Sequence, residues 1–157
     1  MASASTPTHR TLIVANRTAG THLLLQEVDR RAAERPTAFV LLIPDVTSRN
    51  AADWTLNEGL KSLRRAAQGA TGNRPAHVEG MIGGPHAFES IERALAEGDF
   101  DDVVISTLPK RTSQWLKRDL PARVEKLGVP VTVITAPKAQ RMSFEESGIW
   151  GGGGFGA

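Results

Sequence analysis

The chain has 157 residues, of which 40% are hydrophobic and 23% are charged, a balance typical of one globular domain. Its 19 basic and 17 acidic residues leave a net charge of +2, and only 5% of its residues are aromatic, so we expect no nucleic-acid partner. The absence of cysteine excludes a disulfide framework and a thiolate zinc site. The apolar runs are shorter than the roughly 18–20 residues of a membrane span, and residues 1–10 do not resemble a signal peptide. We therefore expect a cytoplasmic protein without a membrane partner.

Five short apolar runs are predicted to be buried strands. They lie at residues 11–15, 37–43, 77–82, 102–107 and 129–135. Most are continuous apolar stretches, rich in β-branched residues and bounded by turn-forming residues, rather than alternations of apolar and polar residues.

Helical patterns separate these strands. A first helix is expected from a Thr21 cap to Pro36, with one apolar face, and further helices at 51–68 and 86–97. Another helical stretch precedes the last strand, with Asp119 as an N-cap and Pro121 in the first turn. The expected apolar face of the first helix comprises Leu23, Leu24, Val28 and Ala32, and Arg31 is expected to lie largely off this face.

Alternation of buried strands with helices predicts an α/β fold, a doubly wound five-stranded parallel sheet with helices on both faces. In such a fold a ligand binds beyond the carboxyl ends of the strands, where the strand order reverses. We expect this domain to span residues 10–138, with a flexible N-terminal tail at 1–9 and a Gly-rich C-terminal tail at 139–157.

Common cofactor motifs do not account for the sequence. The G-x-G-x-x-G spacing of Gly151, Gly153 and Gly156 is accidental because no predicted strand precedes it, and no Walker loop is present. The four histidines are scattered, so no metal site is predicted. A phospho-receiver domain would need an aspartate after the third strand, where this chain has Gly83-Gly84.

Polar residues gather after the first and fourth predicted strands, in loops that face each other in this fold. Lys110 and Arg111 supply cations, and Thr112 and Ser113 supply hydroxyls at the start of a helix, a combination that suits a phosphate. The alternative is that Thr112 or Ser113 only caps that helix and the basic pair is solvated. Both interpretations remain open from the sequence.

Three segments of the chain resemble the universal stress protein family, over about residues 10–136. The run 11–16 is similar to the family's opening strand, 78–91 to its third strand and the glycine-led start of the next helix, and 101–106 with 129–134 to its closing half. This resemblance implies the strand order 3-2-1-4-5. It also implies a homodimer, commonly formed along the last strand, here residues 129–135, and binding of ATP or another adenine nucleotide by some members.

The loops depart from the pattern of the ATP-binding members of that family. Asn16 stands where an acidic residue is expected, Leu108 and Arg111 replace glycines, and Arg118-Asp119 replaces a glycine and hydroxyl pair. Any nucleotide would therefore be held by side chains rather than by a glycine-rich backbone. The candidate nucleotide- or phosphate-binding residues are Ala15, Asn16, Arg17, Thr18, Ser106, Thr107, Lys110, Arg111, Thr112, Ser113 and Arg118.

The leading hypothesis is a regulatory or stress-response module, non-enzymatic, with an adenine nucleotide or other phosphate ligand in a modified crevice. A dimeric protein-interaction module that binds no nucleotide is the alternative, and binding to a nucleotide would separate the two. A slow ATP-hydrolysing enzyme is a third hypothesis, although the sequence brings no nucleophile, base and orienting group together.

Overall fold

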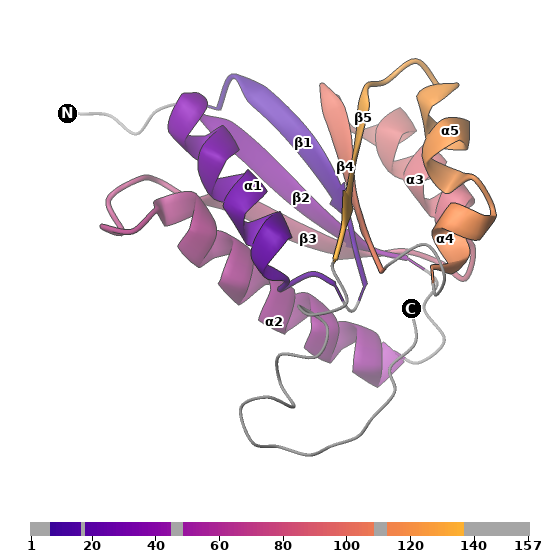
Figure 1. Cartoon of the computed structure of the whole chain (residues 1–157), viewed down its shortest axis with the longest axis horizontal. Coiled ribbons are helices and arrows are strands. Elements are labelled where there is room, and N and C mark those ends of the chain that lie inside the picture. The colour runs from indigo at the N-terminus through magenta and orange to yellow at the C-terminus, as the bar shows by residue number, and fades with distance from the viewer. Residues whose placement is uncertain (1–6, 17, 45–48, 109–112, 137–157) are drawn as a thin grey trace.

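A five-stranded parallel sheet forms the middle layer of the structure (Figure 1). The computed structural model describes residues 7–16, 18–44, 49–108 and 113–136. The strands are β1 (His9–Val14), β2 (Thr37–Ile43), β3 (His77–Ile82), β4 (Asp102–Thr107) and β5 (Val131–Thr135). They lie in the order β3-β2-β1-β4-β5, and every neighbouring pair is parallel. The predicted doubly wound sheet and its strand order are confirmed.

Helices cover both faces of this sheet. They are α1 (His22–Glu34), α2 (Arg49–Gln68), α3 (Ala87–Glu97), α4 (Gln114–Lys117) and α5 (Leu120–Glu125). In Figure 1, α1 and α2 lie on one side of the strands, and α3, α4 and α5 lie on the other. No helix in the described ranges is long and apolar enough to cross a membrane.

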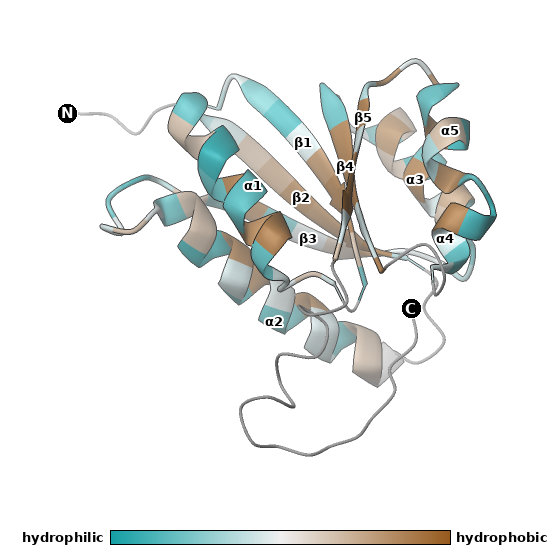
Figure 2. Ribbon diagram, in the orientation of Figure 1, coloured by the Kyte–Doolittle hydropathy of each residue, from teal (hydrophilic) through white to brown (hydrophobic). Residues whose placement is uncertain are grey.

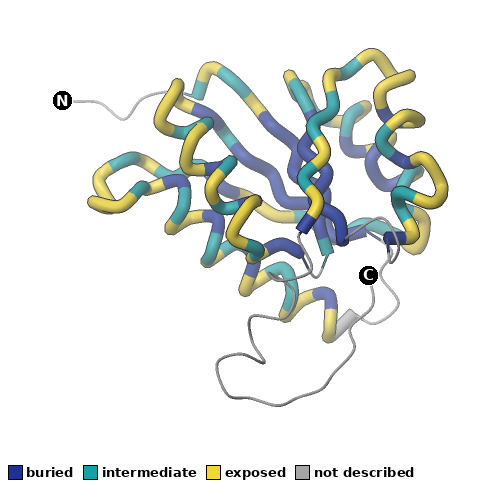
Figure 3. Tube along the Cα trace, in the orientation of Figure 1, coloured by how far each residue is buried: buried dark blue, intermediate teal, exposed yellow. Residues whose placement is uncertain are grey.

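Each face of the sheet has its own hydrophobic core, because successive side chains of a strand point to opposite faces. Ile13 and Leu41 pack with Leu24 of α1 and Leu63 of α2. On the other face, α3 and α5 pack against Leu12, Val14 and Leu42, the strand neighbours of these residues, and against Ile105 of β4. The hydropathy colouring shows the apolar residues concentrated in the strands, and burial follows the same pattern (Figures 2 and 3). The three central strands, β1, β2 and β4, are therefore buried on both faces, which explains their continuous apolar runs.

The largest difference from the predicted elements lies before β5. The predicted helical stretch is two short helices, α4 and α5, separated at Asp119, whose φ of 54° and ψ of 37° are left-handed. Asp119 occupies the predicted N-cap position of α5, but its side chain makes no capping hydrogen bond. β5 begins at Val131 rather than residue 129, because Pro130 has no amide hydrogen to donate to the ladder.

The apolar face of α1 also differs from the prediction at its first residue. Leu24 and Val28 are buried, as predicted, whereas Leu23 is 37% exposed. Arg31, expected largely off this face, instead points toward the sheet, and its side chain is only 12% exposed.

Candidate functional site

The switch point of the sheet lies between β1 and β4, which are neighbours in the sheet. The chain leaves β1 toward α1 on one face and leaves β4 toward α4 and α5 on the other (Figure 1). Because the two connections diverge, a crevice is expected between them at the carboxyl edge. Most of the candidate residues lie in these two connections.

Two hydrogen bonds join the connections across the switch point. The Thr18 hydroxyl donates to the Ser106 carbonyl oxygen at 2.8 Å, and the Ser106 hydroxyl donates to the Thr18 carbonyl oxygen at 3.4 Å. Both residues are buried, Thr18 at 2% and Ser106 at 0% exposure. These hydroxyls therefore hold the loop after β1 against the end of β4.

The other candidate residues in the described part of these loops are also tied to the sheet. Ala15 is buried, and its amide donates to the Leu42 carbonyl oxygen at 3.2 Å. Asn16 is half-buried, and its Nδ2 donates to the Pro44 carbonyl oxygen at 3.3 Å. The buried Thr107 donates its hydroxyl to the Leu108 carbonyl oxygen at 3.0 Å.

Ser113 and Arg118 lie at the two ends of α4. Ser113 is the N-cap, its Oγ accepts a hydrogen bond from the Leu116 amide at 3.2 Å, and it is 3% exposed. Ser113 therefore caps α4, which is one of the two roles that the sequence left open. Arg118 is exposed at the C-cap.

The remaining candidates, Arg17, Lys110, Arg111 and Thr112, lie outside the described residues. The described part of the site thus contributes buried, hydrogen-bonded hydroxyls and the Asn16 amide. Within it, no group of three or more histidine, aspartate or glutamate side chains could hold a metal ion. Most of the cations expected to bind a phosphate, namely Arg17, Lys110 and Arg111, therefore lie outside the described residues.

Comparison with solved structures decides the fold family. A universal stress protein from Archaeoglobus fulgidus is similar with a TM-score of 0.56 at 16% identity, over 82% of this chain and 94% of that chain. A universal stress protein solved in complex with cAMP is similar with a TM-score of 0.51 at 14% identity, over 82% of this chain and 99% of that chain. This chain has the universal stress protein fold. The resemblance seen in the sequence is confirmed at the level of the fold, although no family model and no curated protein sequence matches the chain.

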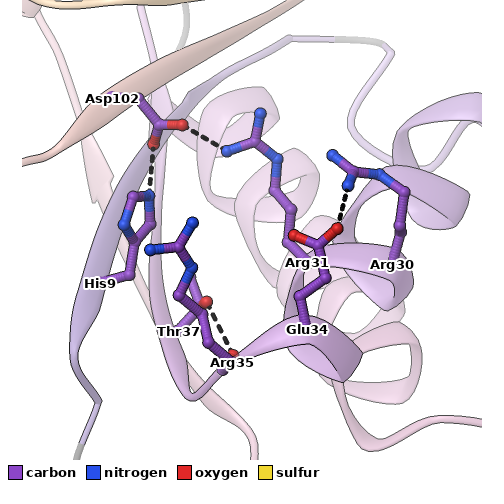
Figure 4. A pocket seen from close by; sticks show the side chains of 7 residues that line it. All are labelled: His9, Arg30, Arg31, Glu34, Arg35, Thr37 and Asp102. Carbon is purple, nitrogen blue, oxygen red and sulfur yellow. Dashed lines mark hydrogen bonds and ion pairs between the residues drawn. The ribbon is translucent and has the colours of Figure 1, made fainter.

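The opposite, amino edge of this universal stress protein fold holds an ion-pair network that the sequence analysis missed (Figure 4). Arg31 of α1 donates from Nη1 to Asp102 of β4 at 2.5 Å and from Nε to Glu27 at 2.6 Å. Asp102 also accepts from the Thr11 hydroxyl at 2.7 Å and lies 3.3 Å from His9 Nε2. The network ties α1 to the starts of β1 and β4.

Burial and pairing act in opposite directions on the charges of this network. Burial raises the pKa of Asp102, but the hydrogen bonds from Arg31 and Thr11 outweigh it, so the pKa lies below its ordinary value. Burial likewise lowers the pKa of Arg31, and its bonds to Asp102 and Glu27 outweigh that effect. The hydrogen bond from Arg30 lowers the pKa of Glu27 against an opposing effect of burial, and Arg31 lowers it further. All three groups are therefore held in their charged forms.

A sequence signal for this network existed in the pair Asp101-Asp102, which stands directly before an apolar strand. A charged residue at the start of a buried strand needs a partner. The partner could not be named from the sequence, because Arg31 is 71 positions away.

Proposed function

We propose that the chain is a regulatory stress-response module that binds an adenine nucleotide, or another phosphate ligand, at the carboxyl edge between β1 and β4. The observation that carries the proposal is the pair of hydrogen bonds between Thr18 and Ser106, which bring the two connections of the switch point together. Open α/β sheets bind their ligands at this point.

Residues 109–112, which lie outside the described residues, are flanked by two buried residues. Leu108 and Ser113, the residues on either side of this segment, are both buried, at 5% and 3% exposure. The proposal assigns Lys110 and Arg111, which the chain must carry between these two points, to the phosphate. A guanidinium and an ammonium group are strong donors to phosphate oxygens.

The binding mode would depend on side chains. Ser113 uses its hydroxyl to cap α4, and the hydroxyl groups of Thr18 and Ser106 are engaged with backbone carbonyls. Their role in this proposal is to position the loops, while Asn16, Arg17, Lys110, Arg111, Thr112 and Arg118 remain the groups expected to contact the ligand. One universal stress protein of similar fold was solved with cAMP, so adenine nucleotides are the first ligands to test.

Calorimetric titration of ATP, ADP and cAMP into the full chain tests the proposal. Replacing Lys110 and Arg111 together with alanine should weaken binding by at least about tenfold, or 1.4 kcal/mol. The matched control, Arg93→Ala with Lys126→Ala, removes two exposed cations from α3 and from the end of α5. Equal affinities in wild type and the Lys110/Arg111 variant, or an equal loss in the control, would defeat the assignment. No binding by the wild type would leave the interaction module as the better hypothesis.

A homodimer through residues 129–135 is our proposal for the assembly, and it also serves the interaction-module alternative. β5 pairs only with β4 in the described sheet, so its other edge carries backbone groups available to a further strand. Val133 on this strand is 40% exposed, and an exposed apolar residue on an unpaired edge suits a symmetric contact.

Light scattering on Val133→Lys tests this assembly, because a charge at the edge should disfavour strand pairing between copies. Val131 is less suitable for substitution, since it packs against the core that includes Leu120 and Val124. Trp54→Lys is the control, because Trp54 on α2 is more exposed, at 67%, and lies on an element that packs against β2 and β3. Dimeric wild type, dimeric Trp54→Lys and monomeric Val133→Lys are expected. A wild type that is monomeric at micromolar concentration would reject the dimer.

A further inference from the structure

A polar cavity of about 170 Å³ lies at the amino edge of the sheet, opposite the proposed nucleotide site (Figure 4). It is bounded by the C-terminal end of α1 and the starts of β1, β2 and β4. Its charged and titratable lining residues are His9, Arg30, Arg31, Glu34, Arg35 and Asp102.

Both carboxylates of the cavity are paired. Asp102 binds Arg31, Thr11 and His9, and Glu34 accepts from Arg30 Nη1 at 2.6 Å. These contacts also occupy two of the three lining arginines, Arg30 and Arg31, since Arg30 binds Glu27 in addition to Glu34. Each of these carboxylates therefore already has an arginine as its counter-ion.

Arg35 is the exception among the lining arginines. Its guanidinium makes no hydrogen bond or ion pair with the residues that the structure describes, and in Figure 4 it extends from the end of α1 toward His9. Its backbone is held on both sides: its amide donates to the Arg31 carbonyl oxygen at 3.2 Å, and its carbonyl accepts from the Thr37 hydroxyl at 3.0 Å. The exposed side chain therefore leaves a fixed point of the backbone without a counter-ion among the described residues.

The guanidinium of Arg35 points to an anion. Arg30 and Arg31 are balanced by Glu27, Glu34 and Asp102, so Arg35 is the lining arginine that binds none of these carboxylates. A guanidinium binds an oxyanion through two parallel hydrogen bonds. Arg35 also borders a second cavity of about 210 Å³, shared with Arg74 and His77. His77 lines this second cavity, and its Nε2 atom is buried without a hydrogen-bond partner among the described residues.

We propose that Arg35 is the anchor of a binding site for a small oxyanion, a carboxylate or a phosphate, in the cavity at the amino edge. The ligand is a small molecule, because the cavity lies below the roughly 300–1,000 Å³ typical of pockets for drug-sized ligands. The site is separate from the proposed nucleotide site, since the two lie at opposite ends of the parallel strands.

Acetate and inorganic phosphate titrated into the ¹⁵N-labelled full chain, up to the millimolar range, test the proposal by NMR. Sodium chloride at matched ionic strength is the reference. Saturable shifts are expected at the amides of His9, Arg35 and Thr37, and the tighter of the two anions identifies the ligand class. Arg35→Gln should raise the dissociation constant at least about tenfold.

Arg93→Gln is the matched control, because it removes the same charge from an exposed arginine on α3, on the other face of the sheet. This control and the Lys110/Arg111 double variant should keep the wild-type response. No saturation beyond the chloride reference, an unchanged constant in Arg35→Gln, or the same loss in Arg93→Gln would overturn the proposal. Loss in the Lys110/Arg111 variant alone would place the anion at the carboxyl edge and would likewise overturn it.

Discussion

Thr18 and Ser106 lie 88 positions apart and exchange hydroxyl-to-carbonyl hydrogen bonds across the switch point. Both residues are buried, so neither carbonyl has water as a ready substitute partner. Thr18, after β1, and Ser106, near the end of β4, are therefore held together by the protein's own hydrogen bonds.

Removing the Thr18 hydroxyl should destabilise the fold. Thr18→Val keeps the shape of the side chain but leaves the Ser106 carbonyl without its 2.8 Å partner, and we expect a loss of about 1–3 kcal/mol in the free energy of unfolding. Thr18→Ser keeps the hydroxyl and is the control. Urea melts of the two variants check this, and a valine variant as stable as the serine variant would contradict it.

Neighbouring arginines on α1 should differ sharply in their effects on stability. Arg31→Gln leaves Asp102 and Glu27 without their shared cation, and the side chains of all three are 12–19% exposed. Breaking a fully buried pair costs roughly 3–5 kcal/mol, so we expect about 2–3 kcal/mol here. Arg30→Gln is the control, because the Arg30 side chain is 54% exposed and its pairs are on the helix surface. Denaturation midpoints that fall equally in both variants would show that the network does not contribute.

Asp102 should make the stability depend on pH in the acid range. Because its pKa is lowered in the folded state, its contribution is complete above the unfolded pKa of about 4 and is lost as the pH falls through the lower, folded value. Asp102→Asn should be less stable at neutral pH and lose less stability on acidification. Thermal melts at several pH values measure both effects. Asp99→Asn, at an exposed position, should keep the wild-type acid dependence, and an unchanged acid slope in Asp102→Asn would contradict the prediction.

Gly59 in the middle of α2 should resist replacement by alanine, although alanine favours helices by about 1 kcal/mol. A Cβ at this position would lie 2.8 Å from Leu41 Cδ2 and 3.0 Å from Ala19 Cβ. Leu41 is fully buried, and overpacking of this kind costs about 1–3 kcal/mol, so we expect a net loss. A double-mutant cycle with Leu41→Val tests the cause, because shortening Leu41 should cost less in the Gly59→Ala background. Additive effects would rule out the contact.

The layered fold could be predicted from local sequence. The cores of β2 and β4 are continuous apolar runs because both faces are buried, and the intervening helical patterns leave a parallel sheet as the consistent arrangement. The place of the candidate site followed from the same order, since the residues after β1 and β4 must meet at the carboxyl edge. Ser113 was identified as a helix cap or a ligand, and only the structure assigned the capping hydrogen bond.

Other features required the tertiary structure. Helical periodicity placed Leu23 inside and Arg31 largely outside, whereas Leu23 is partly exposed and Arg31 reaches Asp102. The sequence by itself determined which segments become strands and helices, because those preferences depend on residues within a few positions of one another. Only the folded chain decided that Arg31 meets Asp102 and that Arg35 has no partner in the part of the chain that the structure describes. The reason is physical: the electrostatic partner of a charge depends on the register of strands distant in sequence, which no local pattern encodes.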